Sequence, residues 1–508
     1  MKYIILFTIL FFFSNPGLSQ EDSIPSYDLL ITNATIIDGT GAAGYIGNLG
    51  ITGDEIIFIG KEMIQPYDAK ETIDATGYTV TPGFIDSHSH GDPLQTSLFH
   101  NFLAMGVTTI SLGQDGYSPE EELSQWIQKV EEIGPGVNIT MFIGHNTLRG
   151  LAGVNYDSVP SKEGLYKMQQ LLKEAMQAGA FGMSTGLEYS PGNFSREDEL
   201  NALAKTVGEE QGIIMSHLRN EDDSEIENSL DELLNQGKYA PVHIAHIKVV
   251  YGKGSRRALQ IIQKLDSARN AGIKVTADLY PYTASHTGIG ILFPDWAKKP
   301  NNFEEVVGSK REELEDFLRK KVIQRNGPEA TLLGSGPYKG KTLADVSKEL
   351  NKPYEQVLIE DIGPYGAGAA HFIMDEELQK TFLIDDYISI SSDGSPTMHH
   401  PRGYGSFSKI IEEYVLQDKI LTLEQAIYKM TGLPAKILQL QNRGILKKGN
   451  KADVLIFKPE EITTNAKYEE PHQLSQGMEY IVVNGKLVLV EGEFKETRRG
   501  KVLKKKKV

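Results

Sequence analysis

Two histidines, His88 and His90, stand two positions apart at the end of an apolar run and just before Gly91-Asp92-Pro93. Side chains at positions i and i+2 of a β-strand point to the same side. His88 and His90 therefore present two imidazoles to one side of a predicted strand. Neutral imidazoles are good ligands for a divalent metal such as zinc. A bare His-x-His pair is as often two solvated histidines, so the metal hypothesis depends on the rest of the chain.

The middle of the chain alternates short apolar runs with amphipathic helical stretches. The apolar runs that we predict to be strands are residues 84–90, 108–115, 139–145, 181–187, 213–218, 242–249, 275–282 and 387–393. Eight strands alternating with helices predict an α/β fold, a (β/α)8 TIM barrel, over residues 81–439. A long helical and charged segment, about 295–375, precedes the last strand, and we expect it to be an insertion that covers the barrel mouth as a lid.

Both ends of the chain have a different texture, with short β-like runs separated by turn residues. They occupy residues 21–80 and 440–500, and Asn484-Gly485 is the strongest hairpin signal. We predict a small β-sandwich domain built from both termini. The basic residues within 501–508 are expected to form a frayed, solvated tail.

In a TIM barrel the active site lies at the C-terminal ends of the strands. The predicted strand ends carry a set of histidines and aspartates: His88, His90, Asp115, His145, His217, His243 or His246, and Asp393. His243 and His246 point to opposite sides of their strand by parity, and we favour His246 because it is closer to the strand end. His145 is interpreted as a residue behind the ligands or in contact with substrate. Each member alone has an alternative as a structural residue; the set predicts a metal site.

Such a site predicts hydrolysis. A metal held by histidines and carboxylates lowers the pKa of a water molecule from ~15.7 toward ~7. A nearby carboxylate such as Asp393 can take the proton and later hand it to a leaving amine. These are the catalytic groups of a hydrolase that acts on an amide, a lactone or an ester.

These residues resemble the amidohydrolase superfamily and, within it, the D-aminoacylase (N-acyl-D-amino-acid deacylase) branch. The resemblance covers nearly the whole chain after residue 20. It rests on motifs at residues 81–90, 106–110, 144–149, 184–189, 217–221, 245–248, 278–282, 392–394, 400–402, 443–453 and 483–485.

The resemblance implies a zinc centre of one or two divalent metal ions. His217 and His246 would hold the tightly bound zinc. His88, His90 and Asp393 would form a second, often weaker, metal position. Asp393 would also be the general acid and base.

The resemblance also implies a substrate site. Lys248, Tyr280 and Arg402 match positions that bind the substrate carboxylate, and a cation with a donor would orient an anionic N-acyl amino acid. Tyr189 would line the scissile carbonyl or the acyl pocket. The alternative for Lys248 and Arg402 is surface charge.

The chain departs from that branch at two positions. Asp115, in Gly113-Gln114-Asp115-Gly116, stands where the branch typically has a cysteine ligand. An aspartate can still ligate or bridge, although it is a harder and shorter-reaching ligand. His286 stands where related enzymes tend to have a small polar residue, which is expected to alter recognition on the carboxylate side.

We therefore expect a metal-dependent hydrolase that cleaves the amide of N-acyl amino acids, with D-amino acids as the expected configuration. One rival keeps the site and changes the bond: a dipeptidase, a cyclic-amide hydrolase or a lactonase. Another rival is a sugar- or peptide-binding barrel without catalysis, which the retained His and Asp set argues against.

Composition limits the partners and the compartment. The chain has 508 residues, a formal net charge of −16 and no cysteine. The negative charge argues against a nucleic-acid partner, and the lack of cysteine excludes disulfides, thiolate ligands and a lipoprotein anchor. Residues 1–20 have Lys2, an apolar core and small residues before residue 20, so we predict a signal peptide and a secreted or periplasmic bacterial protein without a stable membrane anchor. The alternative is an N-terminal membrane anchor.

Overall fold

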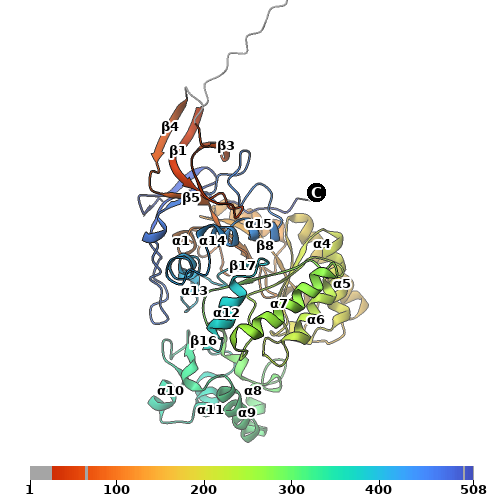
Figure 1. Cartoon of the computed structure of the whole chain (residues 1–508). Helices are drawn as coiled ribbons and strands as arrows, with labels where there is room; N and C mark the ends of the chain where they lie inside the picture. Colours follow the sequence, from red (N-terminus) through yellow and green to blue (C-terminus); the bar gives the residue numbers. More distant parts are fainter. Residues whose placement is uncertain (1–25, 63–66, 496–497, 507–508) are drawn as a thin grey trace, which may run out of the picture.

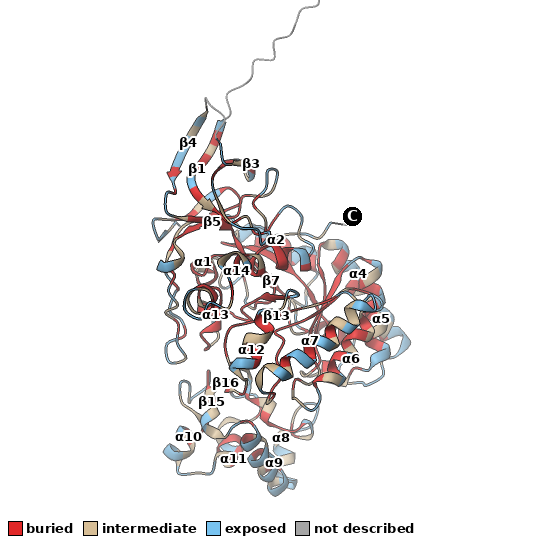
Figure 2. Cartoon of the chain, in the orientation of Figure 1, coloured by how far each residue is buried: buried red, intermediate tan, exposed pale blue. Residues whose placement is uncertain are grey.

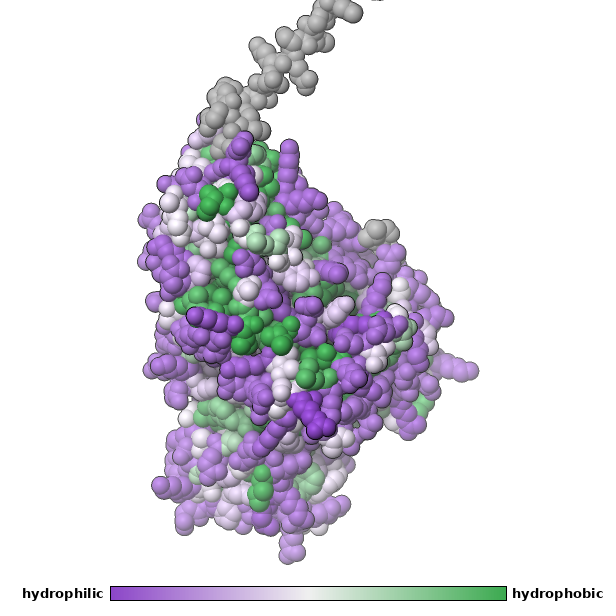
Figure 3. Space-filling model, viewed as in Figure 1, coloured by the Kyte–Doolittle hydropathy of each residue, from purple (hydrophilic) through white to green (hydrophobic). Residues whose placement is uncertain are grey.

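The computed structural model describes residues 26–62, 67–495 and 498–506. The predicted signal peptide lies outside these residues. Figure 1 shows a β-domain at the top, a barrel in the middle and an insertion at the bottom. On the face shown in Figure 3, hydrophilic residues cover most of the surface. In the described part of the chain, every helix lacks the length or the apolar character needed to cross a bilayer.

Both ends of the chain contribute to the β-domain, as predicted, and its nine strands are paired in one continuous sheet rather than in the two sheets of a sandwich. Its strands are β1 (Ser26–Ile36), β2 (Tyr45–Thr52), β3 (Glu55–Gly60), β4 (Asp68–Asp74), β5 (Thr79–Pro82), β18 (Val454–Phe457), β19 (Met478–Val483), β20 (Lys486–Val490) and β21 (Glu493–Phe494). Strands β5 and β18 pair antiparallel, with Val80 opposite Ile456, and so join the two ends. Asn484 and Gly485 both have positive φ, 48° and 77°, which is the conformation of a tight hairpin turn between β19 and β20.

The predicted TIM barrel is confirmed, and each of the eight predicted runs contains a strand. The barrel strands are β6 (Phe84–Asp86), β7 (Val107–Leu112), β8 (Asn138–Met141), β9 (Ile143–Gly144), β10 (Gly182–Gly186), β11 (Ile213–His217), β12 (Val242–Ile244), β13 (Val275–Leu279) and β17 (Ile388–Ile390). The third strand is divided at Phe142 into β8, which pairs with β7, and β9, which pairs with β10. A parallel bridge between Ser89 and Gly394 closes the barrel between β6 and β17.

Helices cover the outside of the barrel, and their buried faces are red in Figure 2. They are α1 (His100–Ala104), α2 (Leu123–Ile133), α3 (His145–Leu151), α4 (Lys162–Ala178), α5 (Glu197–Glu209), α6 (Ile226–Gln236), α7 (Gly254–Asn270), α12 (Glu376–Leu383), α13 (Arg402–Lys409), α14 (Leu423–Met430) and α15 (Gly432–Ile437). Helix α4 shows the pattern: Met168, Leu172 and Met176 recur every four residues and are buried against the barrel. The Ser161 side chain caps this helix by accepting a hydrogen bond from the Gly164 amide.

The insertion between β13 and β17 is a folded unit with its own core. It contains β14 (Ala284–Gly288), α8 (Phe303–Ser309), α9 (Arg311–Gln324), β15 (Thr331–Leu333), α10 (Leu343–Leu350), α11 (Tyr354–Val357) and β16 (Gly368–Phe372). The three strands form an antiparallel sheet in the order β14-β16-β15. Leu314, Leu318 and Leu358 pack in a separate cluster inside it. The insertion begins at Ala284, earlier than the predicted residue 295, because β14 pairs with β16 rather than with the barrel.

The prediction of a frayed C-terminal tail is wrong for the residues that the structure describes. Val502 is buried and packs with the barrel core. The Leu503 amide donates to the carbonyl of Ile139 (2.7 Å), and the Lys505 amide donates to that of Gly179 (2.9 Å). The lysines of this segment suggested a solvated tail, but the buried Val502 and the backbone hydrogen bonds of its neighbours hold the segment on the barrel.

Candidate metal centre and active site

The barrel brings six predicted metal ligands to its C-terminal mouth. They are His88 and His90 after β6, Asp115 after β7, His217 at the end of β11, His246 after β12 and Asp393 after β17. Asp115, His246 and Asp393 have left-handed backbone, with φ of 54°, 37° and 48°. This conformation is costly for residues other than glycine and gathers at functional sites. Three such residues at one mouth indicate a site that the fold holds in place.

The first group of ligand atoms joins β6, β7 and β17. His90 Nε2 lies 3.1 Å from an oxygen of Asp393 and 3.4 Å from an oxygen of Asp115. His88 Nε2 lies 3.3 Å from the other oxygen of Asp115 and 3.7 Å from Asp393. Two atoms that bind one metal at ~2.0–2.1 Å in tetrahedral geometry are about 3.3 Å apart. The four side chains are therefore spaced as ligands of one ion.

The second group shares Asp115 with the first. His246 Nε2 lies 3.6 Å from Asp115 Oδ1, and His217 Nδ1 lies 4.0 Å from the same atom. The two imidazole nitrogens are 2.9 Å apart. Because Asp115 belongs to both groups, its carboxylate stands where it can bridge two metal ions.

The chemistry of these side chains fits a metal. Both ring nitrogens of His88 and Oδ1 of Asp115 are buried and have no hydrogen-bond partner among the residues that the structure describes. Buried polar atoms almost always have a partner, and each exception requires an explanation. A bound metal would supply the missing partner for His88 Nε2 and Asp115 Oδ1.

The charges of the two aspartates are fixed by their neighbours. Burial opposes the ionisation of Asp115, but His88 and His246 offset it and hold the pKa of that carboxyl well below its usual range. Burial also opposes the ionisation of Asp393, and the Arg402 guanidinium, 2.8 Å away, lowers the pKa of Asp393 together with His246. Both carboxylates therefore carry the charge that a metal ligand needs.

Two glutamates that the sequence reasoning did not assign stand behind the histidines of the second group. Glu188 lies 3.0 Å from His217 Nε2, and Glu221 lies 3.2 Å from His246 Nδ1. A carboxylate on the far nitrogen fixes the tautomer and orientation of a metal-binding imidazole. Both glutamates lie inside quoted motifs, 184–189 and 217–221, but a motif alone does not say which nitrogen they face.

The structure decides between His243 and His246. His243 is turned away from the mouth, and its ring nitrogens lie 2.7 Å from Asp278 and 2.7 Å from Thr276 Oγ1. Asp278 also accepts a hydrogen bond from the His246 amide (3.0 Å). The His243–Asp278 pair thus supports the loop that presents His246.

Four predicted substrate-binding residues line an inner chamber of about 220 Å³ beside the metal ligands: Tyr189, Lys248, Tyr280 and Arg402. Lys248 and Arg402 are only 6% and 2% exposed, so the surface-charge alternative does not hold. The Lys248 ammonium contacts both oxygens of Glu221, at 2.8 and 3.0 Å, and the Arg402 guanidinium lies 4.7 Å from the ring of Tyr280. Burial raises the pKa of Tyr280 to about 12, and within the described part of the chain its hydroxyl has no hydrogen-bond partner. The chamber offers two cations and a free donor.

The other side of the chamber is formed by Tyr189 and His286. The Tyr189 ring lies 4.5 Å from that of His217, and its hydroxyl is 3.2 Å from Thr287 Oγ1. His286, on β14 of the insertion, lines the chamber beside Arg402. Burial, with the charge of Arg402, lowers the pKa of His286 to about 3, so this imidazole is neutral.

The prediction that His145 contacts substrate or supports the ligands is wrong. His145 begins helix α3, is fully buried, and its Nε2 lies 2.6 Å from Glu199. Glu199 also pairs with the buried Arg149 (2.5 Å). His145 lines neither the inner chamber nor the larger cavity next to it. His145 is the first residue of α3, and the helix turns its side chain away from the mouth toward Glu199.

Comparisons with known proteins agree with this geometry. A family model described as "Amidohydrolase family" matches residues 381–489. N-acyl-D-aspartate deacylase of Alcaligenes xylosoxydans xylosoxydans is 30% identical, over 95% of this chain and 96% of that protein. N-acyl-D-glutamate deacylase of Bordetella bronchiseptica, solved with zinc and a phosphonate mimic of the tetrahedral intermediate, is 29% identical over 94% of this chain and 100% of that one, with a TM-score of 0.81. A D-aminoacylase with a binuclear metal centre has also been solved. It is 27% identical to this chain, over 94% of this chain and 100% of that one, with a TM-score of 0.81.

The TIM barrel, the sheet from both chain ends and the His and Asp cluster at the strand ends define an amidohydrolase. The sequence identity of 30% with the N-acyl-D-aspartate deacylase, over nearly the whole length of both proteins, identifies the branch of this class. The chain belongs to the D-aminoacylase (N-acyl-D-amino-acid deacylase) family.

Proposed function

We propose that the protein is a zinc-dependent hydrolase that cleaves the amide bond of N-acyl-D-amino acids. One observation carries the proposal: two groups of metal-ligand side chains share Asp115 directly beside a small chamber with two buried cations. The named relatives act on N-acyl-D-aspartate and N-acyl-D-glutamate, which supports this bond and this configuration.

His217, His246 and Asp115 would hold one ion, and His88, His90 and Asp393, with Asp115 shared, would hold the other. A divalent metal bound there would polarise an amide carbonyl and make water a stronger nucleophile at neutral pH.

The side chains of the inner chamber orient the substrate. Arg402 and Lys248 attract the carboxylate of an N-acyl amino acid, and the Tyr280 hydroxyl donates a hydrogen bond to it. Asp393, at the edge of the chamber, takes a proton from the attacking water and gives it to the nitrogen of the leaving amino acid. Tyr189, across the metal ligands, is placed to contact the scissile carbonyl.

The main rival activities differ in the group beside the scissile bond. Asp393 and Glu221, which pair with Arg402 and Lys248, also face histidines of the metal groups, so the two buried cations still favour a substrate carboxylate. A lactone or a cyclic amide has no carboxylate to offer them. A dipeptide also has a carboxylate, but it carries an ammonium group next to the scissile carbonyl. Among the described residues, each carboxylate near that position already has a predicted role as a metal ligand or as an ion-pair partner, so none is left to bind the ammonium group.

A substrate panel tests the proposal. N-acetyl-D-amino acids, their L-enantiomers, D,D-dipeptides, a hydantoin and a lactone would be incubated with zinc-loaded protein, and release of free amine or acid would be measured. We expect hydrolysis of the N-acetyl-D-amino acids. Preference for the L-enantiomers or for the cyclic compounds would refute the proposal, and loss of activity on removal of zinc with recovery on re-addition is the control.

We further propose that the protein is exported. Lys2, the apolar residues 3–13 and the small residues that follow support a cleaved signal peptide. Expression of the full chain in a bacterium, cell fractionation and N-terminal sequencing would test this. A protein that stays in the cytoplasm with Met1 in place would contradict it.

A further inference from the structure

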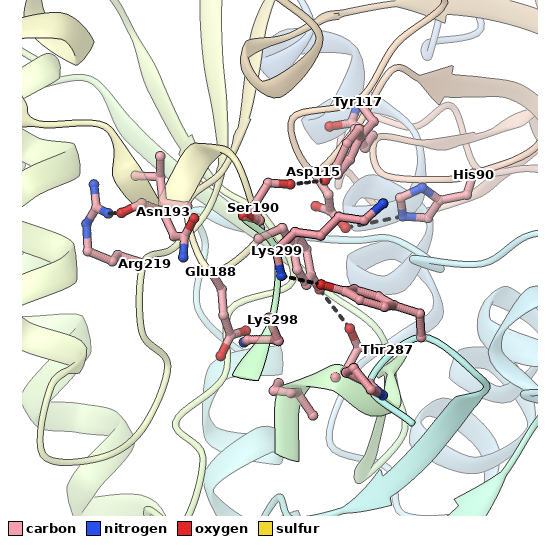
Figure 4. A pocket seen from close by; sticks show the side chains of 18 of the residues that line it. His90, Asp115, Tyr117, Glu188, Ser190, Asn193, Arg219, Thr287, Lys298 and Lys299 are labelled. Atoms are coloured by element: carbon pink, nitrogen blue, oxygen red, sulfur yellow. Dashed lines mark hydrogen bonds and ion pairs between the residues drawn. The ribbon is translucent and has the colours of Figure 1, made fainter. Parts of the chain in front are cut away.

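Two cavities meet at the metal centre. The outer cavity, about 1180 Å³, lies between the barrel mouth and the insertion, and Figure 4 shows some of its lining. It shares His90, Asp115, Glu188, Tyr189, Thr287 and Ile291 with the inner chamber. An amide bond placed at the metal ligands therefore lies where the two cavities join.

The position of the two buried cations, Arg402 and Lys248, fixes the orientation of a bound substrate. This step rests on the proposed function. In an N-acyl amino acid, the acyl group and the carboxylate lie on opposite sides of the amide bond. When Arg402 and Lys248 hold the carboxylate in the inner chamber, the carbonyl carbon lies at His90 and Asp115, and the acyl group extends into the outer cavity.

The wall of the outer cavity is rich in apolar and aromatic side chains. Its main apolar members are Tyr117, Leu187, Ile291, Trp296, Phe317 and Tyr365. Tyr117, Phe317 and Tyr365 are 49%, 37% and 62% exposed and line the same cavity, and exposed apolar side chains gathered in one place, rather than scattered singly, are typical of a binding site. Tyr117 is held in place because its hydroxyl donates to the Ser190 carbonyl (2.6 Å), as Figure 4 shows.

The cations of this cavity are mostly paired within the protein. Arg219 binds Glu232 (2.9 Å), Lys298 binds Asp295 (3.1 Å), and Lys321 lies 3.6 Å from Asp222. These pairs reduce the attraction for an anion, so the wall favours an apolar occupant.

The size of the cavity exceeds what an acetyl group needs. Pockets of about 300–1,000 Å³ hold drug-sized ligands, whereas an acetyl group has three non-hydrogen atoms. We propose that the outer cavity is an acyl subsite, and that the preferred substrates are amino acids N-acylated with a long apolar chain. Hydrolysis adds water across the amide: the acyl carbon gains an oxygen and leaves as a carboxylate, and the nitrogen gains a proton and leaves with the amino acid.

An acyl-length series tests the inference. One D-amino acid would carry acetyl, butanoyl, octanoyl or dodecanoyl groups, each assayed below its aggregation concentration with the zinc-loaded full chain. We expect kcat/KM to rise by up to about fourfold for each methylene that becomes buried, until the cavity is filled. A flat or falling series, with acetyl substrates hydrolysed, would overturn the inference and leave the proposed function intact. No hydrolysis of any member would overturn both.

Substitutions of residues that line the outer cavity test whether the acyl chain binds there. Tyr117→Ala and Phe317→Ala should each lower the ratio of kcat/KM for dodecanoyl over acetyl substrate by about tenfold. Tyr166→Ala is the matched control, because Tyr166 is 63% exposed on α4 outside the cavity. An unchanged ratio in both wall variants, with melting curves like the wild type, would refute the assignment.

A second series separates the acyl group from the amino-acid side chain. Acetyl would be kept constant while the D-amino acid side chain is lengthened from alanine to norleucine. If activity rises with the side chain but not with the acyl chain, the outer cavity takes the side chain and the inference is wrong.

Discussion

Replacement of Glu188 by glutamine tests how the second metal group is built. Glu188 accepts a hydrogen bond from His217 Nε2 at 3.0 Å, while His217 Nδ1 faces Asp115 and His246. Glutamine keeps the size and the hydrogen-bonding reach but removes the charge that makes the imidazole a more basic ligand. Glu188→Gln should therefore weaken metal binding without unfolding the protein.

The structure also sets the size of the effect. Loss of such an outer carboxylate typically costs 10–100-fold in metal affinity, or about 1.4–2.7 kcal/mol. The Glu188 side chain is 26% exposed, so water can partly replace it, and we expect about tenfold. Glu221 is 8% exposed and behind His246, but it also neutralises Lys248, so its substitution would mix metal binding with the cost of an unpaired buried cation.

The assay is competition for zinc with a chromophoric chelator, for wild type, Glu188→Gln and the surface control Glu163→Gln on α4. Zinc dissociation constants within twofold of each other in all three proteins would refute the role of Glu188 behind His217. A loss much above 100-fold would show instead that Glu188 is itself a ligand, an arrangement that the grouping of Glu188, His217 and Glu221 allows.

Four further predictions follow from single side chains. Asp115→Ala should lower the metal content of dialysed protein in both groups while Asp115→Cys largely keeps it; equal metal content in Asp115→Ala and wild type would remove Asp115 from the ligands. Asp393→Asn should cut kcat by about 10²–10⁴ in protein that is still folded at the assay temperature, although melting should occur earlier because Arg402 loses its ion-pair partner; wild-type turnover would exclude Asp393 as the proton carrier. Glu199→Gln should lower the free energy of unfolding by about 3–5 kcal/mol in urea titrations, because it leaves Arg149 buried without its ion-pair partner; a loss below 1 kcal/mol would contradict this. Burial lowers the pKa of Lys429 from 10.5 to about 8, so between these pH values the unfolded chain binds more protons than the folded protein. The free energy of unfolding should therefore rise from pH 8 toward pH 10.5. The rise should be smaller in Lys429→Met, and a rise equal to that of the wild type would refute the assignment.

The sequence was enough to predict the barrel and its mouth because both depend on local patterns. Each apolar run contains a strand, and His88, Asp115 and Asp393, which lie two or three residues beyond their strand ends, reach the mouth because it is formed by the loops at those ends. His246 was also found in this way, because it follows β12 and His243 lies within it.

The remaining features depend on contacts between distant segments. Glu188 and Glu221 acquire their roles from the histidines of neighbouring strands, and sequence spacing does not show which nitrogen a carboxylate will face. His145 was misplaced because a short break at Phe142 and the start of α3 altered the register. The tail was misjudged because Val502 finds its partners near Ile139, far earlier in the chain.

The pairing of β5 with β18 has a consequence for how the molecule is made. Nearly the whole barrel separates the two strands in the sequence, so the pairing that joins the two chain ends cannot form until synthesis has passed residue 457. Until then β5 has an open edge, and long-range pairing of this kind is slow. A polypeptide of this design therefore carries an unpaired strand edge on β5 for most of its synthesis, and such an edge can pair with other chains until β18 covers it.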